Sequence, residues 1–418
     1  MKEEFGLVLE GGGAKGSYEI GACKALEEMD IKITAVAGTS VGALNGAMVA
    51  QHEIDKAYQL WYDMHYSKVI NVDSRRLKKL ARLEIRPDDI RYFLRILKEI
   101  IAEGGIDVSP LQQLIKKHVN EEKLRKSKIA FGMVTVSFTD RKALELFVED
   151  IPEGQIADYL FASANFPLFR SAKIEDKIYS DGGIYDNLPI RMLIDRGYKS
   201  IITIQVGGWG RKRKVNLDNL HVINIEAQEN LGGPLSFNTK RARYNLKLGY
   251  FDAYRVLKSL KGQHYYINLE HQEDYYVDYF NRLNPDQVVK IARTLGLKGD
   301  IPYKRLLFER ILPRLVEILK LPEDCSYSDI AVALVEKIAL EVGLDRFKIY
   351  SFSELIDCVT TEYGNCERIE KEKEQSIISH FGFLSLFSGD DVLKKLVQDL
   401  LNEEIIDYWR EDKNRIKD

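Results

Sequence analysis

Cysteine is scarce in this sequence, and long apolar runs are missing from it. The four cysteines (Cys23, Cys325, Cys358 and Cys366) have wide and irregular spacing, which is typical of neither a disulfide framework nor a zinc site. No apolar run is long enough for a membrane-spanning helix, and the initial stretch MKEEFGLVLE holds no apolar signal segment. We therefore expect a cytoplasmic protein without a metal site.

The chain also has little net charge. Its 61 basic and 64 acidic side chains leave a formal charge of −3, which argues against a general nucleic-acid binder. Hydrophobic residues occupy 45% of the 418 positions, enough for a substantial core. At this length we expect more than one domain.

A serine flanked by glycines is the most informative feature. Residues 38–42 (GTSVG) have the pattern G-x-S-x-G and lie between an apolar run at 33–37 that predicts a buried strand and a segment at 43–51 that predicts a helix. A serine on such a sharp turn, here Ser40, presents its hydroxyl outside the sheet. We expect a Cβ at Gly38 or Gly42 to clash with neighbouring backbone. A glycine-rich loop with an incidental serine is the alternative.

A run of three glycines follows the first predicted strand, at residues 5–9. Consecutive glycines leave N–H groups free to converge on a negative oxygen, and the helix predicted at 17–29 adds its positive N-terminal end. An acyl-transfer enzyme needs such donors for the oxyanion of its tetrahedral intermediate. Gly11, Gly12 and Gly13 are therefore candidate oxyanion donors. Lys15, on the same loop, either orients it or forms a surface salt bridge.

The same loop matches nucleotide-binding motifs less well. Gly11, Gly13 and Gly16 satisfy G-x-G-x-x-G, but the acidic residue expected at the end of the second strand of a dinucleotide fold is missing, and Ser40 stands there instead. A P-loop requires serine or threonine after its lysine, where this chain has Gly16. We expect no nucleotide and no other cofactor.

A third motif supplies a carboxylate. Residues 180–189 (SDGGIYDNLP) place Asp181 before Gly182 and Gly183 in a loop that holds the carboxylate and permits close backbone approach. Taken alone, the fragment favours a turn in which Asp181 bonds its own backbone. Its combination with a candidate nucleophile and a candidate oxyanion loop, each at the end of a predicted strand, favours a catalytic role.

Together these motifs resemble the patatin-like phospholipase family. Residues 11–16 fit its oxyanion motif G-G-G-x-K/R-G, residues 38–42 its nucleophile elbow, and residues 181–183 its acid motif D-G-G/A. Residues 162–167 (ASANFP) are similar to the family's A-S-x-x-x-P segment, which lies between the serine and the aspartate. All four occur in the family's order, and the resemblance covers residues 4–266.

The resemblance implies a Ser–Asp dyad in place of a triad. Ser40 would attack the ester carbonyl, and Asp181 would take its proton and later pass it to the leaving alcohol. Because the reference pKa of aspartate is about 3.9, burial must raise the basicity of Asp181. Supporting residues would be Lys15, Gly38, Gly42, Gly182 and Gly183.

Histidine separates this scheme from an ordinary α/β-hydrolase, which uses serine, an acid and a histidine in that chain order. The histidines after Asp181 are His221, His264, His271 and His380. None lies on an obvious loop after a strand, and His221 falls in an expected interior strand at 220–225. We predict that replacing any single histidine leaves ester hydrolysis largely intact.

Apolar runs and periodic segments alternate through the first part of the chain. Further strands are predicted at 129–136, 200–206 and 221–225, and helices at 54–66 and 190–196. This alternation indicates an α/β fold with a mostly parallel central sheet covered on both faces, a three-layer α/β/α domain over residues 1–269. The serine would lie at the carboxyl ends of the strands, where open α/β folds bind ligands.

Two segments of this domain have open interpretations. An insertion at about 67–128 holds a basic cluster at 75–82 and an amphipathic segment at 90–101. Three interpretations of it are open: ordinary surface helices, which we favour, a cap over an acyl pocket, or a basic element that lies on anionic lipid. Residues 207–214 (GGWGRKRK) suit either a contact with phospholipid headgroups or a solvated loop.

Periodic segments replace the alternation after about residue 270. Helices are predicted at 285–295, 302–319, 328–342, 353–361 and 391–408, with starts near Asn284, Ser328 and Ser353. We expect a helical accessory domain over residues 270–418, for which dimerisation, regulation and recruitment all fit. The apolar run 381–387 (FGFLSLF) suits a core segment, a docking patch or a membrane contact.

The sequence thus favours a serine acyl hydrolase that cleaves carboxylic esters of phospholipids or related lipids without a metal. Water would resolve the acyl-enzyme, with Asp181 again as the base. A transacylase or thioesterase would use the same machinery, and an interaction protein on the same scaffold is the non-enzymatic alternative. A lipid or ester is the expected partner; contact with a membrane surface and homo-oligomerisation through the helical domain are both compatible with the sequence.

Overall fold

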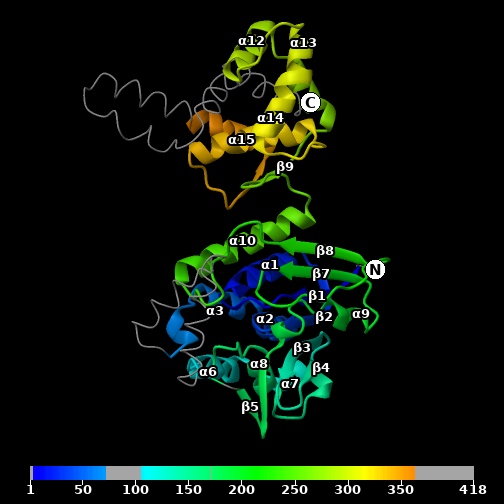
Figure 1. Ribbon diagram of the computed structural model, residues 1–418, viewed down its shortest axis with the longest axis vertical. Coiled ribbons are helices and arrows are strands. Elements are labelled where there is room, and N and C mark those ends of the chain that lie inside the picture. Colours follow the sequence, from blue (N-terminus) through cyan, green and yellow to red (C-terminus); the bar gives the residue numbers. More distant parts are fainter. Residues whose placement is uncertain (1–2, 72–104, 171, 363–418) are drawn as a thin grey trace, which may run out of the picture. The chain divides into compact units, whose positions relative to one another are not determined.

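The computed structural model describes residues 3–71, 105–170 and 172–362, and its chain divides into two compact units, 1–257 and 258–418 (Figure 1). The sequence pattern places this boundary at 269/270, whereas the packing places it at 257/258. None of the helices in the described ranges is both long and apolar enough to cross a membrane.

An eight-stranded sheet forms the centre of the first unit. Its strand order is β5-β6-β3-β2-β1-β7-β8, and β4 pairs with β3. Neighbours from β3 to β8 in this order are parallel. Strands β4 and β6 each pair antiparallel with β3, and β5 pairs antiparallel with β6. The strands are β1 (Glu4–Leu9), β2 (Lys32–Thr39), β3 (Ala130–Ser137), β4 (Lys142–Phe147), β5 (Ala172–Ile174), β6 (Lys177–Asp181), β7 (Ser200–Gln205) and β8 (His221–Glu226).

Helices cover both faces of this sheet. On one face α2 packs against Val36 and Phe131, and α1 packs against both α2 and α10 (Figure 1). On the other face Met192 and Leu193 of α9 join a cluster with β1, β2, β3 and β7. The helices in the described part of this unit are α1 (Gly16–Glu28), α2 (Val41–Ala50), α3 (Ile54–Tyr62), α6 (Ser109–His118), α7 (Glu121–Lys126), α8 (Ile156–Ser163), α9 (Ile190–Ile194) and α10 (Thr239–Leu257). Short 3₁₀ turns are η1 (Gly13–Lys15), η2 (Tyr66–Lys68), η4 (Val148–Asp150) and η5 (Gly182–Ile184).

The three-layer architecture with a mostly parallel sheet is confirmed, with one correction. The strand that contains His221 was expected in the interior, but β8 is the last strand of the sheet. The His221 side chain is 55% exposed and its ring bonds Glu3 at 2.8 Å. The apolar run around it was consistent with either position, since one buried face is enough to produce it.

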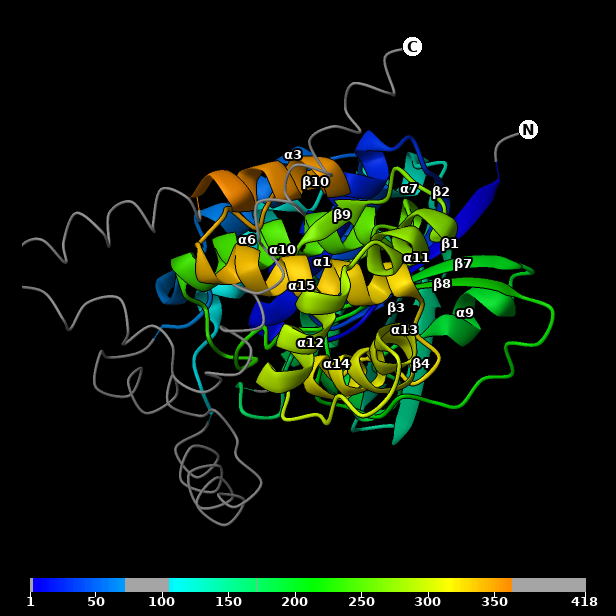
Figure 2. The ribbon, with the colours of Figure 1, turned by 90° about the horizontal axis from the view of Figure 1, so that it is seen from above.

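The second unit has its own apolar core. Its helices are α11 (Glu273–Asn281), α12 (Pro285–Thr294), α13 (Tyr303–Leu306), the π-helical segment η6 (Leu307–Ile311), α14 (Leu312–Leu319), α15 (Tyr327–Glu341) and a helical stretch at 352–362 (Figure 2). A small parallel pair, β9 (Tyr266–Asn268) and β10 (Ile349–Ser351), accompanies them. The helical character expected here is confirmed.

Two helix starts in the second unit test the capping predictions. Asn284 caps α12 and accepts a hydrogen bond from the Gln287 N–H, as predicted. The start predicted near Ser328 is wrong by two residues, because Ser326 is the cap and accepts from the Asp329 N–H. Both serines precede the same apolar periodicity, so the pattern alone did not separate them.

Several expected features lie outside the described residues. They are the basic cluster at 75–82, the amphipathic segment at 90–101, Cys366, His380, the apolar run 381–387 and the helix at 391–408.

Candidate active site

Ser40 occupies a strained turn between β2 and α2. Its backbone has φ 55° and ψ −125°, a conformation rare for a residue with a side chain. A Cβ on Gly38 would lie 2.3 Å from the Gly42 carbonyl oxygen, and one on Gly42 would lie 2.4 Å from the Leu9 carbonyl oxygen. The expected need for both glycines is confirmed, since backbone on each side leaves no room for a side chain.

Asp181 ends β6 and meets Ser40 across the sheet. Only 5% of Asp181 is exposed, and its Oδ1 accepts a hydrogen bond from the Gly183 N–H at 2.8 Å. Burial raises the pKa of the Asp181 carboxyl to about 6, against the opposing effect of hydrogen bonds from the Ser40 side chain and the Gly183 N–H. The structure therefore brings together a hydroxyl and a buried, basic carboxylate.

The segment at 162–167 connects these two residues. Ser163 Oγ accepts the Ser40 N–H at 3.1 Å, and the Asn165 carbonyl accepts the Asp181 N–H at 2.9 Å. Both Ser163 and Asn165 are buried. One short segment thus fixes the backbone at the serine and at the aspartate.

The triple-glycine loop lies against the serine turn. A Cβ on Gly11 would approach the Ser40 Cβ to 3.2 Å, and Gly13 has φ +59° with the Pro234 carbonyl oxygen 2.1 Å from its own Cβ position. The Gly11 N–H donates to the Asn187 carbonyl at 3.0 Å. We expected three oxyanion donors, but the Gly11 N–H is already hydrogen-bonded within the protein, which leaves Gly12 and Gly13 as the candidates. For the N–H groups of Gly12 and Gly13, no acceptor is found in the described part of the chain.

Asn187 was missed as a site residue, although it belongs to the quoted motif at 180–189. Its Nδ2 donates to the Gly11 carbonyl at 2.9 Å, and its own carbonyl accepts from Gly11, so two hydrogen bonds join the acid loop to the glycine loop. The Asn-x-Pro pattern after the aspartate was the only available signal. That pattern indicated a turn, but it did not indicate that Asn187 is the hydrogen-bond partner of Gly11.

Lys15 contacts the backbone of the loop after β7. Its Nζ donates to the Gly207 carbonyl at 2.6 Å, and partial burial lowers its pKa. Of the two roles expected for Lys15, orientation of a loop matches this contact.

An apolar cavity of about 550 Å³ opens beside the serine and the aspartate. This volume is within the usual range for small-molecule sites. Ser40, Asp181 and the three glycines line one part of it, and side chains from α2, α3 and α6 line another. Its apolar walls include Val41, Leu44, Met48, Leu60, Trp61, Met64, Val69, Leu111, Leu114, Ile115, Phe166, Phe169, Leu235 and Phe237.

The loop at 207–214 forms part of the cavity rim. Trp209 is 67% exposed, and with Gly210 and Arg211 it lines the cavity. Two of the four consecutive basic residues have internal partners: Lys212 contacts Glu10 at 3.0 Å and Arg213 contacts Glu145 at 3.1 Å. The loop is therefore anchored to the domain.

One histidine that the sequence did not indicate lines the cavity. His118, at the end of α6, lines the cavity, and burial lowers its pKa. Within the described ranges, no group of three or more histidine, cysteine or acidic side chains is arranged to hold a metal ion.

A family model described as Patatin-like phospholipase matches residues 7–194. The first unit carries a patatin-like phospholipase domain. The match includes the elbow, the glycine loop and the acid loop, and it confirms the resemblance seen in the motifs.

Curated relatives share parts of this patatin-like domain. Lysophospholipase nte1 of Aspergillus terreus is 56% identical over 46 residues, 11% of this chain and 3% of its own. Lysophospholipase NTE1 of Mycosarcoma maydis is 26% identical over 204 residues (49% and 10%). Human patatin-like phospholipase domain-containing protein 6 is 25% identical over 209 residues (48% and 13%). The chain thus spans a small share of the length of these relatives.

Among solved structures, VipD from Legionella pneumophila is similar to this chain at 16% identity with a TM-score of 0.39. The alignment covers 96% of this chain and 91% of VipD.

Proposed function

We propose that the chain is a serine lipid acyl hydrolase with Ser40 as nucleophile and Asp181 as general base. The observation that carries this proposal is that Ser40 and the buried Asp181 carboxyl line the same apolar cavity, with the Ser40 side chain close enough to lower the Asp181 pKa against the effect of burial. The patatin-like domain supports the class of reaction, and the names of its lysophospholipase relatives support a lipid ester as substrate.

Each step follows from these contacts. As Ser40 Oγ bonds to the ester carbonyl carbon, its proton passes to Asp181 and the carbonyl oxygen becomes an oxyanion. The N–H groups of Gly12 and Gly13 stabilise that oxyanion. Its collapse breaks the bond to the alcohol, which leaves with the proton from Asp181. Water then attacks the carbonyl carbon of the acyl-enzyme and gives a proton to Asp181. The bond between that carbon and Ser40 Oγ breaks, the fatty acid is released, and Ser40 Oγ takes the proton from Asp181.

The basicity of Asp181 makes a dyad chemically reasonable. A carboxylate with a pKa of about 6 is mostly ionised at neutral pH and is a stronger base than a solvated aspartate. The proton transfer is direct, so no histidine is needed between the two residues.

The cavity rim suits a lipid surface. Trp209 and Ile184 are 67% and 47% exposed and line the cavity. Arg211, two residues after Trp209, is exposed and supplies positive charge. An exposed tryptophan next to a basic side chain is typical of protein at the headgroup level of a membrane. We therefore include contact with an anionic lipid surface in the proposal.

The test is release of fatty acid from a panel of phospholipids and lysophospholipids, offered as vesicles and as soluble short-chain esters. The wild type should hydrolyse both, and Ser40→Ala and Asp181→Asn should each lower kcat by about a thousandfold or more. Trp209→Ala should lower turnover of vesicles and leave soluble esters within about twofold, since it touches only the rim.

Control variants separate the outcomes. His221→Ala should retain activity, because His221 lies on the edge strand and does not line the cavity. Acyl transfer to an alcohol in place of water would assign a transacylase, and turnover restricted to thioesters a thioesterase. A wild type that neither hydrolyses the panel nor reacts with a fluorophosphonate at Ser40 would contradict the enzymatic proposal.

A further inference from the structure

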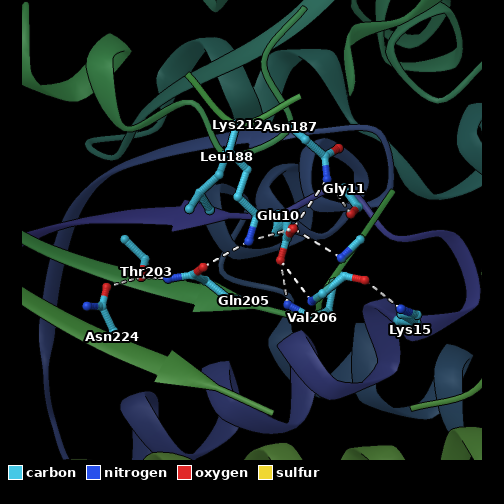
Figure 3. Close-up of polar contacts among 12 residues, drawn as sticks. Glu10, Gly11, Lys15, Asn187, Leu188, Thr203, Gln205, Val206, Lys212 and Asn224 are labelled. Carbon is cyan, nitrogen blue, oxygen red and sulfur yellow. Dashed lines mark hydrogen bonds and ion pairs between the residues drawn. The ribbon is translucent and has the colours of Figure 1, made fainter. Parts of the chain in front are cut away.

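Glu10 is a fully buried carboxylate that receives a run of main-chain N–H groups. It follows β1 directly and precedes the triple glycine. Its Oε2 accepts the N–H groups of Val206 at 2.7 Å and Gly207 at 3.0 Å, and its Oε1 accepts that of Gly208 at 3.0 Å (Figure 3). One side chain therefore fixes three consecutive residues of the loop after β7.

Two side-chain donors complete the surroundings of Glu10. Lys212 Nζ lies 3.0 Å from Oε1, and Asn187 Nδ2 donates to Oε1 at 3.4 Å (Figure 3). All five groups are donors, which suits an ionised carboxylate because it only accepts hydrogen bonds. Lys212 balances the negative charge that burial would otherwise leave unpaired.

The loop that Glu10 holds is packed directly on the glycine loop. A Cβ on Gly208 would lie 1.6 Å from the Gly11 carbonyl oxygen, so the two backbones are in close contact. Lys15 adds a second connection by donating to the Gly207 carbonyl. Asn187 contacts Glu10 and Gly11 through the same amide nitrogen. Movement of residues 206–208 would therefore be transmitted to the residues that carry the oxyanion donors.

We propose that Glu10 is a positioning residue for the oxyanion hole: its carboxylate holds the backbone at 206–208, which sets where the Gly12 and Gly13 N–H groups point. This inference rests on the proposed function and adds a residue that is not among the described residues lining the cavity. Oxyanion donors act on the transition state and contribute little to substrate binding. A positioning role therefore affects kcat more than KM.

The second unit supplies a matched control. Glu336 is also buried, and it accepts the N–H groups of three consecutive residues, Gln263, His264 and Tyr265, at 2.7 to 3.0 Å. Glu336→Gln thus makes the same chemical change in a carboxylate that also accepts three consecutive main-chain N–H groups, but outside the patatin-like unit. It measures the effect of losing such a contact on stability alone.

The experiment compares Glu10→Gln with Glu336→Gln in the full chain. The glutamine amide puts an N–H₂ where an acceptor is needed, so the loop must shift. For Glu10→Gln we expect kcat on a soluble ester to fall between about 10- and 100-fold, with KM changed by less than about threefold. The rate of fluorophosphonate attack on Ser40 should fall in parallel. Glu336→Gln should keep kcat within about twofold.

Glu10→Asp provides a second variant should Glu10→Gln not fold. It keeps the charge and shortens the reach, so we expect kcat to fall below that of the wild type with little change in KM. An active wild type together with unchanged kcat in every Glu10 variant that folds overturns the positioning role alone. Equal kcat losses in Glu10→Gln and Glu336→Gln overturn it too, because the loss would then reflect stability. A wild type without turnover counts against the proposed function and against this inference with it.

Discussion

Asp181 combines a chemical advantage with a cost in stability. Burial favours its neutral form, so the folded protein holds a proton there more tightly than the unfolded chain does. The favourable contribution is fully present below the unfolded pKa of 3.8 and is lost as pH rises through about 6. At neutral pH the ionised carboxylate destabilises the fold by at most about 3 kcal/mol.

Asp181→Asn should therefore be more stable than the wild type at alkaline pH. Asparagine keeps the shape and an acceptor oxygen for Gly183, and it carries no buried charge. We expect its unfolding free energy to exceed that of the wild type by about 1 to 3 kcal/mol near pH 8, with the difference shrinking towards pH 4. Urea unfolding at the two pH values measures this. A wild type more stable than Asp181→Asn at pH 8 would contradict the assigned burial effect.

At the residue scale, the sequence predicted the reactive groups but not the contacts that hold them. Ser40 and Asp181 were identifiable because their motifs require glycine beside a functional side chain. Glu10 was not, since a charged residue at the end of an apolar strand gives no sign of its partners. The donors it meets at 206–208 are nearly 200 positions away. The sequence also led us to expect the Gly11 N–H as an oxyanion donor. Its hydrogen bond to the Asn187 carbonyl forms only when the acid loop is folded, so the sequence gives no sign of it.

At the scale of elements, α6 is the part of the insertion that contacts the cavity. Leu111, Leu114 and Ile115 of this helix line the cavity beside side chains of α2 and α3. The described end of the insertion therefore forms part of the cavity wall, and the cap over an acyl pocket stays a prediction. Its basic cluster lies outside the described residues.

Filling the cavity from α6 should shorten the preferred acyl chain. Leu114 is half-buried and lines the cavity, so Leu114→Trp should displace about two methylenes of a bound chain, each worth about 0.8 kcal/mol. We expect kcat/KM for a long-chain ester to fall about tenfold, with little change for an acetyl ester. Kinetics on an ester series measures this.

Gln113→Trp, on the exposed side of the same helix, is the control and should leave the series unchanged. Equal losses for short and long esters in Leu114→Trp would show that α6 does not contact the acyl chain.

The parallel strands were predictable and the antiparallel ones were not. The runs that became β1, β2 and β7 are short, continuous and apolar, as expected of strands buried on both faces. The strands β4, β5 and β6 are short or half-exposed and mix charged with apolar residues, so their pattern is weak. Strands β4 and β6 pair with β3, and β5 pairs with β6. Periodicity within one segment carries no information about such partners.

At the scale of the whole molecule, the two units have separate cores. The large cluster of the second unit contains residues from 265 to 359, whereas the described residues that line the cavity lie between 11 and 237. The groups that we propose for catalysis, Ser40, Asp181 and the N–H groups of Gly12 and Gly13, therefore all belong to the first unit. The sequence separated the same two parts from a change of periodicity near residue 270.

The most direct test of the dyad is the rate of fluorophosphonate reaction at Ser40 as a function of pH. A single carboxylate base with a pKa of about 6 predicts a rate that rises tenfold per pH unit below about 6 and levels off above it. Histidine variants should keep this profile, and Asp181→Asn should react about a thousandfold more slowly with no such rise. A profile preserved in Asp181→Asn, or lost in His118→Ala or His221→Ala, would contradict the account.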